Sequence, residues 1–150
     1  MRKVAWSMVR VDSNMSERAI LEMSRFFNGT MILLDSVTYA GFDVVDPSYL
    51  FNATGKSIIV IQTHSLDLAR VKKALQKHFP DWCERYKVID ETYRRMIPVE
   101  TPWRVIKILA LGMHVEDAIK ITRRLCLYSP IPEPLRIADK IASAISRTFL

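Results

Sequence analysis

Two short runs of consecutive apolar residues constrain the fold of this chain most strongly. They are TMILLD at 30–35 and SIIVIQ at 57–62, and each is bounded by polar or turn-forming residues. Strands covered by helices on both faces show such continuous runs, whereas a strand with one wet face alternates. The two runs therefore predict central, parallel strands of a layered α/β fold with a mostly parallel sheet.

Flanking patterns predict the remaining elements. Larger and smaller side chains alternate over 4–11, which predicts a further strand of the same sheet, and RVIKILAL at 104–111 predicts another. Asn14 and Glu17 have the spacing of a capping box at the start of a helix. Apolar residues at helical spacing predict that helix and three others, and the long stretch between Ser36 and Lys56 predicts a further short helix. The helices are expected at about 15–27, 47–51, 68–79, 115–127 and from Pro134 to Phe149, the last with Leu135, Ala138, Ala142 and Ile145 facing inward.

Length and composition favour one globular domain over residues 1–150. Hydrophobic residues make up 49% of the chain and charged residues 25%, and no repeat or linker interrupts it. No apolar run reaches the roughly 20 residues of a membrane span, so we expect no membrane partner. No secretory signal is recognisable, and Cys83 and Cys126 lie far apart, as in reduced proteins. These features predict a cytoplasmic protein.

The net charge of +6 and a sequence pI of about 9.5 suit an anionic partner such as nucleic acid. Basic side chains gather on one face of the predicted helix at 68–79 and near the end of the helix at 115–127. We expect these side chains to contact phosphates, although ordinary solvated helix faces remain the alternative. They are Lys72, Lys73, Lys77, Arg123 and Arg124.

Three acids are the candidate catalytic residues. Asp35 ends the most apolar predicted strand, and functional groups of such sheets gather beyond the carboxyl ends of strands. Asp12 ends the predicted strand at 4–11, and Asp139 lies beside the apolar stripe of the last helix. Carboxylates from two strand ends and a helix could bind Mg²⁺ or Mn²⁺. Asp12 as a turn residue and Asp139 as the edge of an amphipathic helix remain alternatives.

Other site chemistries fit less well. His64, His78 and His114 have no partner at metal-ligand spacing. ATGKS at 53–57 lacks the upstream glycine of a phosphate-binding loop, and a strand follows it instead of a helix. We therefore place no histidine-based or P-loop site in this chain.

Four segments of the sequence resemble the endonuclease dU family, which is found mainly in archaea. They are LLDSVTYAGFDVVD at 33–46, HFPDWCER at 78–85, GMHVEDA at 112–118 and PIPEPLRIADKIASAI at 130–145. The resemblance implies a relative of endonuclease V with a ribonuclease H-like fold and a metal-dependent nuclease activity. In this pattern Asp35 matches the aspartate at the end of a central strand and is the expected metal ligand, with Asp139 as the second.

The sequence also departs from the family pattern. The family begins with a strand that carries Asp-Asp-Gly, and this chain starts after it, so the resemblance implies an N-terminally truncated member that lacks the first strand and carboxylate. Ser36 replaces a glycine, Asp139 replaces a histidine, and Met15 and Arg18 stand at acidic positions. Because two-metal hydrolysis depends on a complete ligand set, we expect weak Mg²⁺ or Mn²⁺ binding and weak or lost phosphodiester hydrolysis.

Two hypotheses about function follow. The first is a metal-dependent endonuclease in which Asp35 and Asp139 hold the cation. The second is a non-catalytic paralogue that binds nucleic acid or a protein partner. A missing first strand would leave a sheet edge uncovered, and pairing in a homodimer would cover it.

Overall fold

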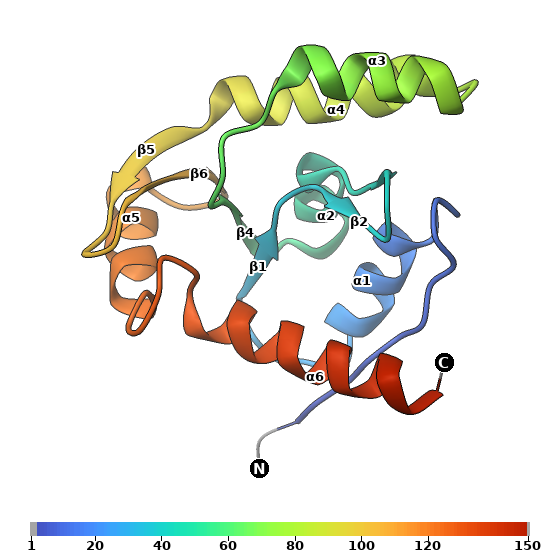
Figure 1. Cartoon of the computed structure of the whole chain (residues 1–150). Helices are drawn as coiled ribbons and strands as arrows, with labels where there is room; N and C mark the ends of the chain where they lie inside the picture. The colour runs from blue at the N-terminus through green and yellow to red at the C-terminus, as the bar shows by residue number, and fades with distance from the viewer. Residues whose placement is uncertain (1–2, 150) are drawn as a thin grey trace.

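The computed structural model describes residues 3–149, which form helices on both faces of a four-stranded sheet (Figure 1). The helices in this part of the chain are α1 (Ser16–Ser24), α2 (Pro47–Thr54), α3 (Leu68–His78), α4 (Trp82–Arg95), α5 (Val115–Leu125) and α6 (Glu133–Phe149). The strands are β1 (Met31–Asp35), β2 (Thr38–Tyr39), β3 (Asp43–Val44), β4 (Ser57–Gln62), β5 (Ile97–Glu100) and β6 (Val105–Leu111). The predicted α/β class and the predicted strands at 30–35 and 57–62 are confirmed.

The sheet has the strand order β1-β4-β6-β5 and is mixed. β1 and β4 are parallel as predicted, but β6 runs antiparallel to both β4 and β5. The expectation of a mostly parallel sheet is therefore wrong. The physical reason is the connection at 101–104, since a turn this short can only join antiparallel strands. β2 and β3 form a separate two-stranded hairpin.

The side chains of β4 alternate between two cores. Ile58 and Val60 pack with Leu50 of α2 and with buried residues of α3 and α4. Ile59 and Ile61 pack on the opposite face with Ala118 of α5. All four β4 side chains are fully buried, and each such side chain contributes about 1.5–3 kcal/mol. Burial on both faces explains why the run at 57–62 is continuously apolar.

The predicted strand at 4–11 is wrong. Residues 3–10 form no strand, and a turn follows at 11–14. The side chains of Val4, Trp6 and Met8 are 66%, 52% and 54% exposed. Alternation alone does not make a strand, because a strand also needs a neighbouring ladder of hydrogen bonds.

The start of α1 also differs from the prediction. Asn14 and Glu17 form no capping box, because Asp43 of β3 accepts hydrogen bonds from the backbone N–H groups of Met15 and Ser16 instead. Glu17 turns to the backbone N–H of Asp46. The cap is therefore supplied by a distant segment.

The last helix is more exposed than predicted. Leu135 of α6 packs against the core that contains Ile59 and Ile61. Ala138 and Ala142 face solvent instead of the interior. α6 lies along one side of the molecule and approaches β1 (Figure 1). Within residues 3–149, no helix is both long and apolar enough to cross a membrane.

Candidate functional site

The carboxyl end of β1 places Asp35 at one edge of the sheet. Asp35 is in register with Ile61 of β4, which pairs with Ile108 of β6. The backbone then turns sharply, because Ser36 adopts a positive φ of 70° while its N–H donates to the carbonyl of Ile61 at 2.9 Å. A left-handed conformation is easiest for glycine, and Ser36 adopts it without being glycine. The turn leaves the Asp35 carboxylate accessible at the strand end.

Asp139 lies on α6 within electrostatic range of Asp35, and the joint role of the two acids as a site stays a prediction. α6 lies beside β1, and the negative charge of Asp139 acts on Asp35. Partial burial raises the pKa of the Asp35 carboxyl above its ordinary value, and the charge of Asp139 raises this pKa further. The two negative charges repel each other, and a bound cation would reduce this repulsion.

His64 is a third member of this cluster that the sequence reading missed. Its charge acts on Asp35 and opposes the rise in the pKa of that carboxyl. His64 lies two residues beyond the end of β4, and its backbone carbonyl accepts a hydrogen bond from the Gln62 side chain at 3.1 Å. The rule that located Asp35, a polar residue just after a buried strand, would also have found His64.

Tyr39 completes the surroundings of Asp35. Burial and the negative charge of Asp35 raise the pKa of the Tyr39 phenol well above its ordinary value. Its hydroxyl donates to the backbone carbonyl of Ser36 at 3.4 Å. Tyr39 therefore stays protonated and offers a neutral O–H group beside the carboxylate.

Asp12 has a local structural contact of its own. It adopts a positive φ of 58°, and its carboxylate accepts a hydrogen bond from the backbone N–H of Phe42 at 2.6 Å. Its own N–H donates to the carbonyl of Ala40 at 2.9 Å. Asp12 thus holds the turn between β2 and β3, and its place in the catalytic group stays a prediction.

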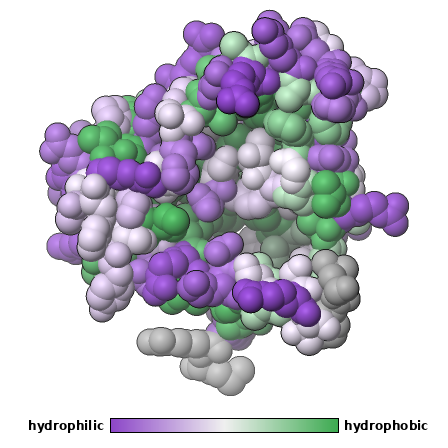
Figure 2. Space-filling model, viewed as in Figure 1, coloured by the Kyte–Doolittle hydropathy of each residue, from purple (hydrophilic) through white to green (hydrophobic). Residues whose placement is uncertain are grey.

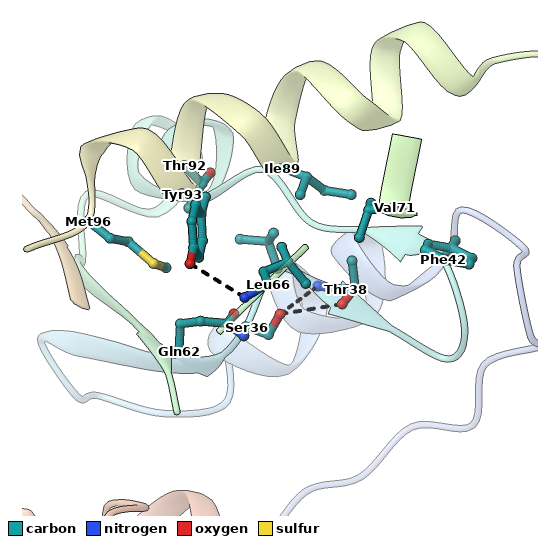
Figure 3. A pocket seen from close by; sticks show the side chains of 11 residues that line it. Ser36, Thr38, Phe42, Gln62, Leu66, Val71, Ile89, Thr92, Tyr93 and Met96 are labelled. Atoms are coloured by element: carbon teal, nitrogen blue, oxygen red, sulfur yellow. Dashed lines mark hydrogen bonds between the residues drawn. The ribbon is translucent and has the colours of Figure 1, made fainter. Parts of the chain in front are cut away.

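A small cavity lies behind the Asp35 edge, between the strand ends and the helices α3 and α4 (Figure 3). Its volume of about 50 Å³ suits one or two water molecules. Ser36, Thr38 and Gln62 supply polar groups on the sheet side, and Tyr93 supplies a hydroxyl from α4. The cavity is too small for a nucleobase as it stands.

Tyr93 connects this cavity to β6. Its hydroxyl accepts hydrogen bonds from the backbone N–H of Leu66 at 3.4 Å and from Nζ of Lys107 at 3.3 Å. The Lys107 ammonium also lies 4.3 Å from the centre of the Tyr93 ring. These two donors lower the pKa of the Tyr93 phenol, because they stabilise its anionic form.

The predicted phosphate-binding residues lie on two separate helices. Lys72, Lys73 and Lys77 are exposed on α3, which is hydrophilic at the top of the molecule (Figure 2). Nζ of Lys72 lies over the rings of Trp82 and Tyr86 on α4, at 5.9 and 5.4 Å from their centres. Arg123 and Arg124 are exposed at the end of α5, on another side of the sheet (Figure 1). The two groups are therefore separate surfaces.

Within residues 3–149, no three side chains of His, Cys, Asp or Glu are grouped as a metal site would require. The pair Asp35 and Asp139 supplies two carboxylate ligands at most. Hydrated Mg²⁺ is commonly held in proteins through one or two carboxylates together with substrate phosphates. The donor set therefore fits one weakly held cation and does not fit a closed cage.

Comparisons with known proteins give consistent results. The UPF0215 protein of Thermococcus gammatolerans is 40% identical over 123 residues, which cover 81% of this chain and 61% of that protein. The UPF0215 protein of Methanothermobacter thermautotrophicus is 37% identical over 143 residues, which cover 92% and 69%. This chain thus spans about three fifths to two thirds of the length of these relatives.

A solved structure has the same fold. The crystal structure of a protein of unknown function from Archaeoglobus fulgidus superposes with a TM-score of 0.78 over 91% of this chain and 78% of that chain, at 22% identity. The sequence pattern of the family described as "Endonuclease dU" matches residues 1–146. Together with the identity to the UPF0215 proteins, this match shows that the chain belongs to the endonuclease dU family.

Proposed function

We propose that the chain binds nucleic acid and a divalent cation at Asp35 and Asp139, with phosphodiester hydrolysis that is weak or lost. The observation that carries this proposal is the position of Asp35 at the carboxyl end of β1, where burial and then the charge of Asp139 raise the pKa of its carboxyl. Carboxylates with raised pKa values in an accessible setting are frequent at functional sites. Membership of the endonuclease dU family supports a phosphodiester as the substrate class.

A bound Mg²⁺ or Mn²⁺ would neutralise the two carboxylates and polarise a phosphate oxygen of the nucleic acid. Asp35 and Asp139 would hold it, and phosphate and water oxygens would supply the remaining ligands. Because two carboxylates make an open site, we expect weak affinity. The ribonuclease H-like relationship and the kinship with endonuclease V belong to this proposal too.

The neighbouring side chains have chemistry that suits a phosphodiester. His64 lies near enough to Asp35 for its charge to lower the pKa of that carboxyl. The Tyr39 hydroxyl remains protonated at neutral pH and donates a hydrogen bond to the backbone carbonyl of Ser36. Exposed lysines of α3 would bind phosphates of the same strand through charge, in a salt-dependent way.

The second candidate function is a non-catalytic paralogue that binds nucleic acid or a protein. The observation in its favour is that two carboxylates form the cluster, with no third acid grouped with them in residues 3–149. A two-metal mechanism stabilises both the attacking and the leaving oxygen, and it needs more ligands than this.

Metal binding is the first test. Mn²⁺ titration of the wild type should show weak binding that is lost in Asp35→Asn and reduced in Asp139→Asn. Glu116→Gln, an exposed acid in the first turn of α5, is the matched control and should bind as the wild type does. Tight binding that survives Asp35→Asn would place the cation elsewhere.

Cleavage is the second test. Labelled DNA and RNA, damaged and undamaged, are incubated with the protein in Mg²⁺ or Mn²⁺ beside the same three variants. We expect salt-sensitive binding with little or no cleavage. Strong cleavage that disappears in Asp35→Asn would contradict the proposal that hydrolysis is weak or lost, and it would show that the protein is an enzyme. Absence of both cleavage and binding would overturn the proposal and leave a protein-binding paralogue.

A further inference from the structure

The turn between β5 and β6 exposes an aromatic and a basic side chain side by side. Trp103 is 53% exposed at this turn, and Arg104 follows it and is exposed as well. An exposed indole presents a flat aromatic face with a polar N–H group, which suits stacking against a flat ring of a ligand. We call residues 101–104 the hairpin tip.

Thr101 makes the hairpin tip rigid. Its hydroxyl donates to the carbonyl of Arg104 at 2.6 Å and accepts from the N–H groups of Trp103 and Arg104 at 3.3 and 3.2 Å. Its backbone N–H also donates to the carbonyl of Arg104 at 3.2 Å. Because these hydrogen bonds hold the turn in one conformation, its backbone loses little conformational entropy when a ligand binds.

The arginines at the end of α5 extend this surface. Nε of Arg123 donates to the backbone carbonyl of Glu100 at 3.0 Å, which brings the end of α5 against the base of the hairpin tip. In the part of the chain that the structure describes, neither Arg104, Arg123 nor Arg124 forms an ion pair with a carboxylate. Three cations beside an exposed indole are complementary to a polyanion that carries flat rings.

Tyr128 lies on the segment that leads from α5 to α6. It is 74% exposed and lies close enough to Arg136 for the two groups to interact electrostatically. α6 begins five residues later and carries Asp139 towards Asp35. Tyr128 and Arg136 therefore lie along the chain between the end of α5 and Asp139 of α6.

The strand register places the hairpin tip beyond the same sheet edge as Asp35. Asp35, Ile61, Ile108 and Ile97 form one row across the sheet, and the pair of Glu100 with Val105 lies three residues further on. Given about 3.3 Å per strand residue and about 4.8 Å between strands, the tip lies on the order of 15–20 Å from Asp35. A stacked single strand at about 3.4 Å per nucleotide covers this separation with roughly five nucleotides.

We propose that the hairpin tip, with Arg123 and Arg124, is a binding surface for single-stranded nucleic acid, on which a base stacks on Trp103 while the arginines contact its phosphates. Single strands expose the faces of their bases, and stacking on aromatic side chains tolerates any base. This inference rests on the proposed function, because it supplies the path by which a strand reaches Asp35.

The test is fluorescence anisotropy with a labelled 15-nucleotide oligo-dT strand in EDTA, where the cation plays no part. Trp103→Ala should weaken binding about ten-fold, and Trp103→Phe, which keeps a ring, should recover most of it. Tyr49→Ala, an exposed aromatic on α2 with 48% exposure, is the control and should bind as the wild type does. Arg104→Ala and Arg123→Ala should each lower the slope of log affinity against log salt by about 0.7.

Several outcomes would overturn the inference. They are unchanged binding by Trp103→Ala, an equal loss in Tyr49→Ala, tighter binding of a 15-base-pair duplex than of the single strand, and no binding by the wild type. The last result would leave a protein partner for the hairpin tip. Because EDTA removes the cation, the effects of the Trp103 and arginine variants are independent of whether Asp35→Asn abolishes Mn²⁺ binding. Failure of the hairpin tip as a binding surface is therefore distinguishable from failure of the cation site.

Discussion

Ser16 donates two hydrogen bonds to a single carboxylate oxygen of Asp43, from its backbone N–H at 2.9 Å and from its hydroxyl at 2.7 Å. The N–H of Met15 donates to the same oxygen at 3.0 Å. Asp43 is fully buried, and its negative charge lies at the start of α1, where the helix dipole favours an anion. The hairpin of β2 and β3 thereby fixes the position of α1.

Removing this cap should destabilise the protein strongly. Asp43→Ala leaves three donors at the start of α1 without their acceptor, so we expect the free energy of unfolding to fall by about 2–4 kcal/mol. Asp43→Asn keeps an oxygen acceptor and should cost about 1 kcal/mol. Urea denaturation of the two variants measures the difference. An equal loss in both would mean that the charge itself, and not the acceptor, holds α1.

Arg85 should be a second stabilising centre. It is 7% exposed, its Nε donates to Asp81 at 3.0 Å, its Nη1 donates to the carbonyl of Phe42, and its guanidinium stacks on Phe79 at 4.4 Å. Arg85→Ala should lower the free energy of unfolding by about 3 kcal/mol, and Arg85→Lys should recover less than half of this because lysine lacks the planar fork.

A matched pair of exposed charges provides the control for Arg85. Arg94 donates to Asp90 at 2.7 Å on the same helix, but its side chain is 71% exposed. Arg94→Ala should therefore cost less than about 0.5 kcal/mol in the same urea denaturation. A loss in Arg94→Ala comparable with that in Arg85→Ala would show that burial does not set the difference.

The sequence predicted those elements whose apolar pattern reflects burial. β4 is covered on both faces and reads as a continuous apolar run, and α3 and α5 show one apolar face each. α4 was missed although Trp82, Tyr86 and Ile89 recur at helical spacing, because two of its three buried residues, Arg85 and Thr92, are polar and weaken the apolar pattern. β5 was missed because it has four residues and contains Pro98, which is tolerated at the sheet edge that β5 occupies.

The site was predictable only where one local rule applied. Asp35 follows from the strand-end rule. Asp139 was placed beside the apolar stripe of the last helix, of which Ala138 and Ala142 face solvent, and its charge acts on Asp35 in the structure. The proposed pairing of Asp35 with Asp12 depended on a strand at 4–11 that does not form. The cap of α1 by Asp43 spans 27 residues, which no local pattern reveals.

Self-association remains a prediction. β1 is the terminal strand of the sheet, and Val4 and Met8 expose apolar side chains in the segment before it. Two copies that pair across these surfaces would cover both, so we expect a two-fold dimer at high micromolar concentration. Met8→Lys should shift light scattering towards the monomer, whereas Val115→Lys, on exposed α5, should not. A monomeric wild type would contradict the prediction.

The pH dependence of stability should reveal the function of Asp35. Its pKa in the folded protein is raised above the ordinary value of 3.8, by burial first and then by Asp139, and His64 opposes the rise. A carboxyl whose folded pKa is raised binds its proton more tightly when folded. Its contribution to stability is therefore largest at low pH and is lost as pH rises from its unfolded value through the folded pKa.

Asp35→Asn should consequently be more stable than the wild type at pH 7 without metal, and this advantage should shrink as pH falls towards 4. Thermal melts between pH 4.5 and 8 in EDTA measure the gap, with Glu116→Gln as the control whose melting temperature should follow the wild type. Mn²⁺ should raise the melting temperature of the wild type and leave the melting temperature of Asp35→Asn unchanged. Only the wild type keeps both carboxylates, whose mutual repulsion a bound cation would reduce. The contrary result is an Asp35→Asn variant that is less stable than the wild type by the same amount at every pH in this range. It would show that Asp35 stabilises the fold, and that its carboxylate does not lower stability in the absence of a cation.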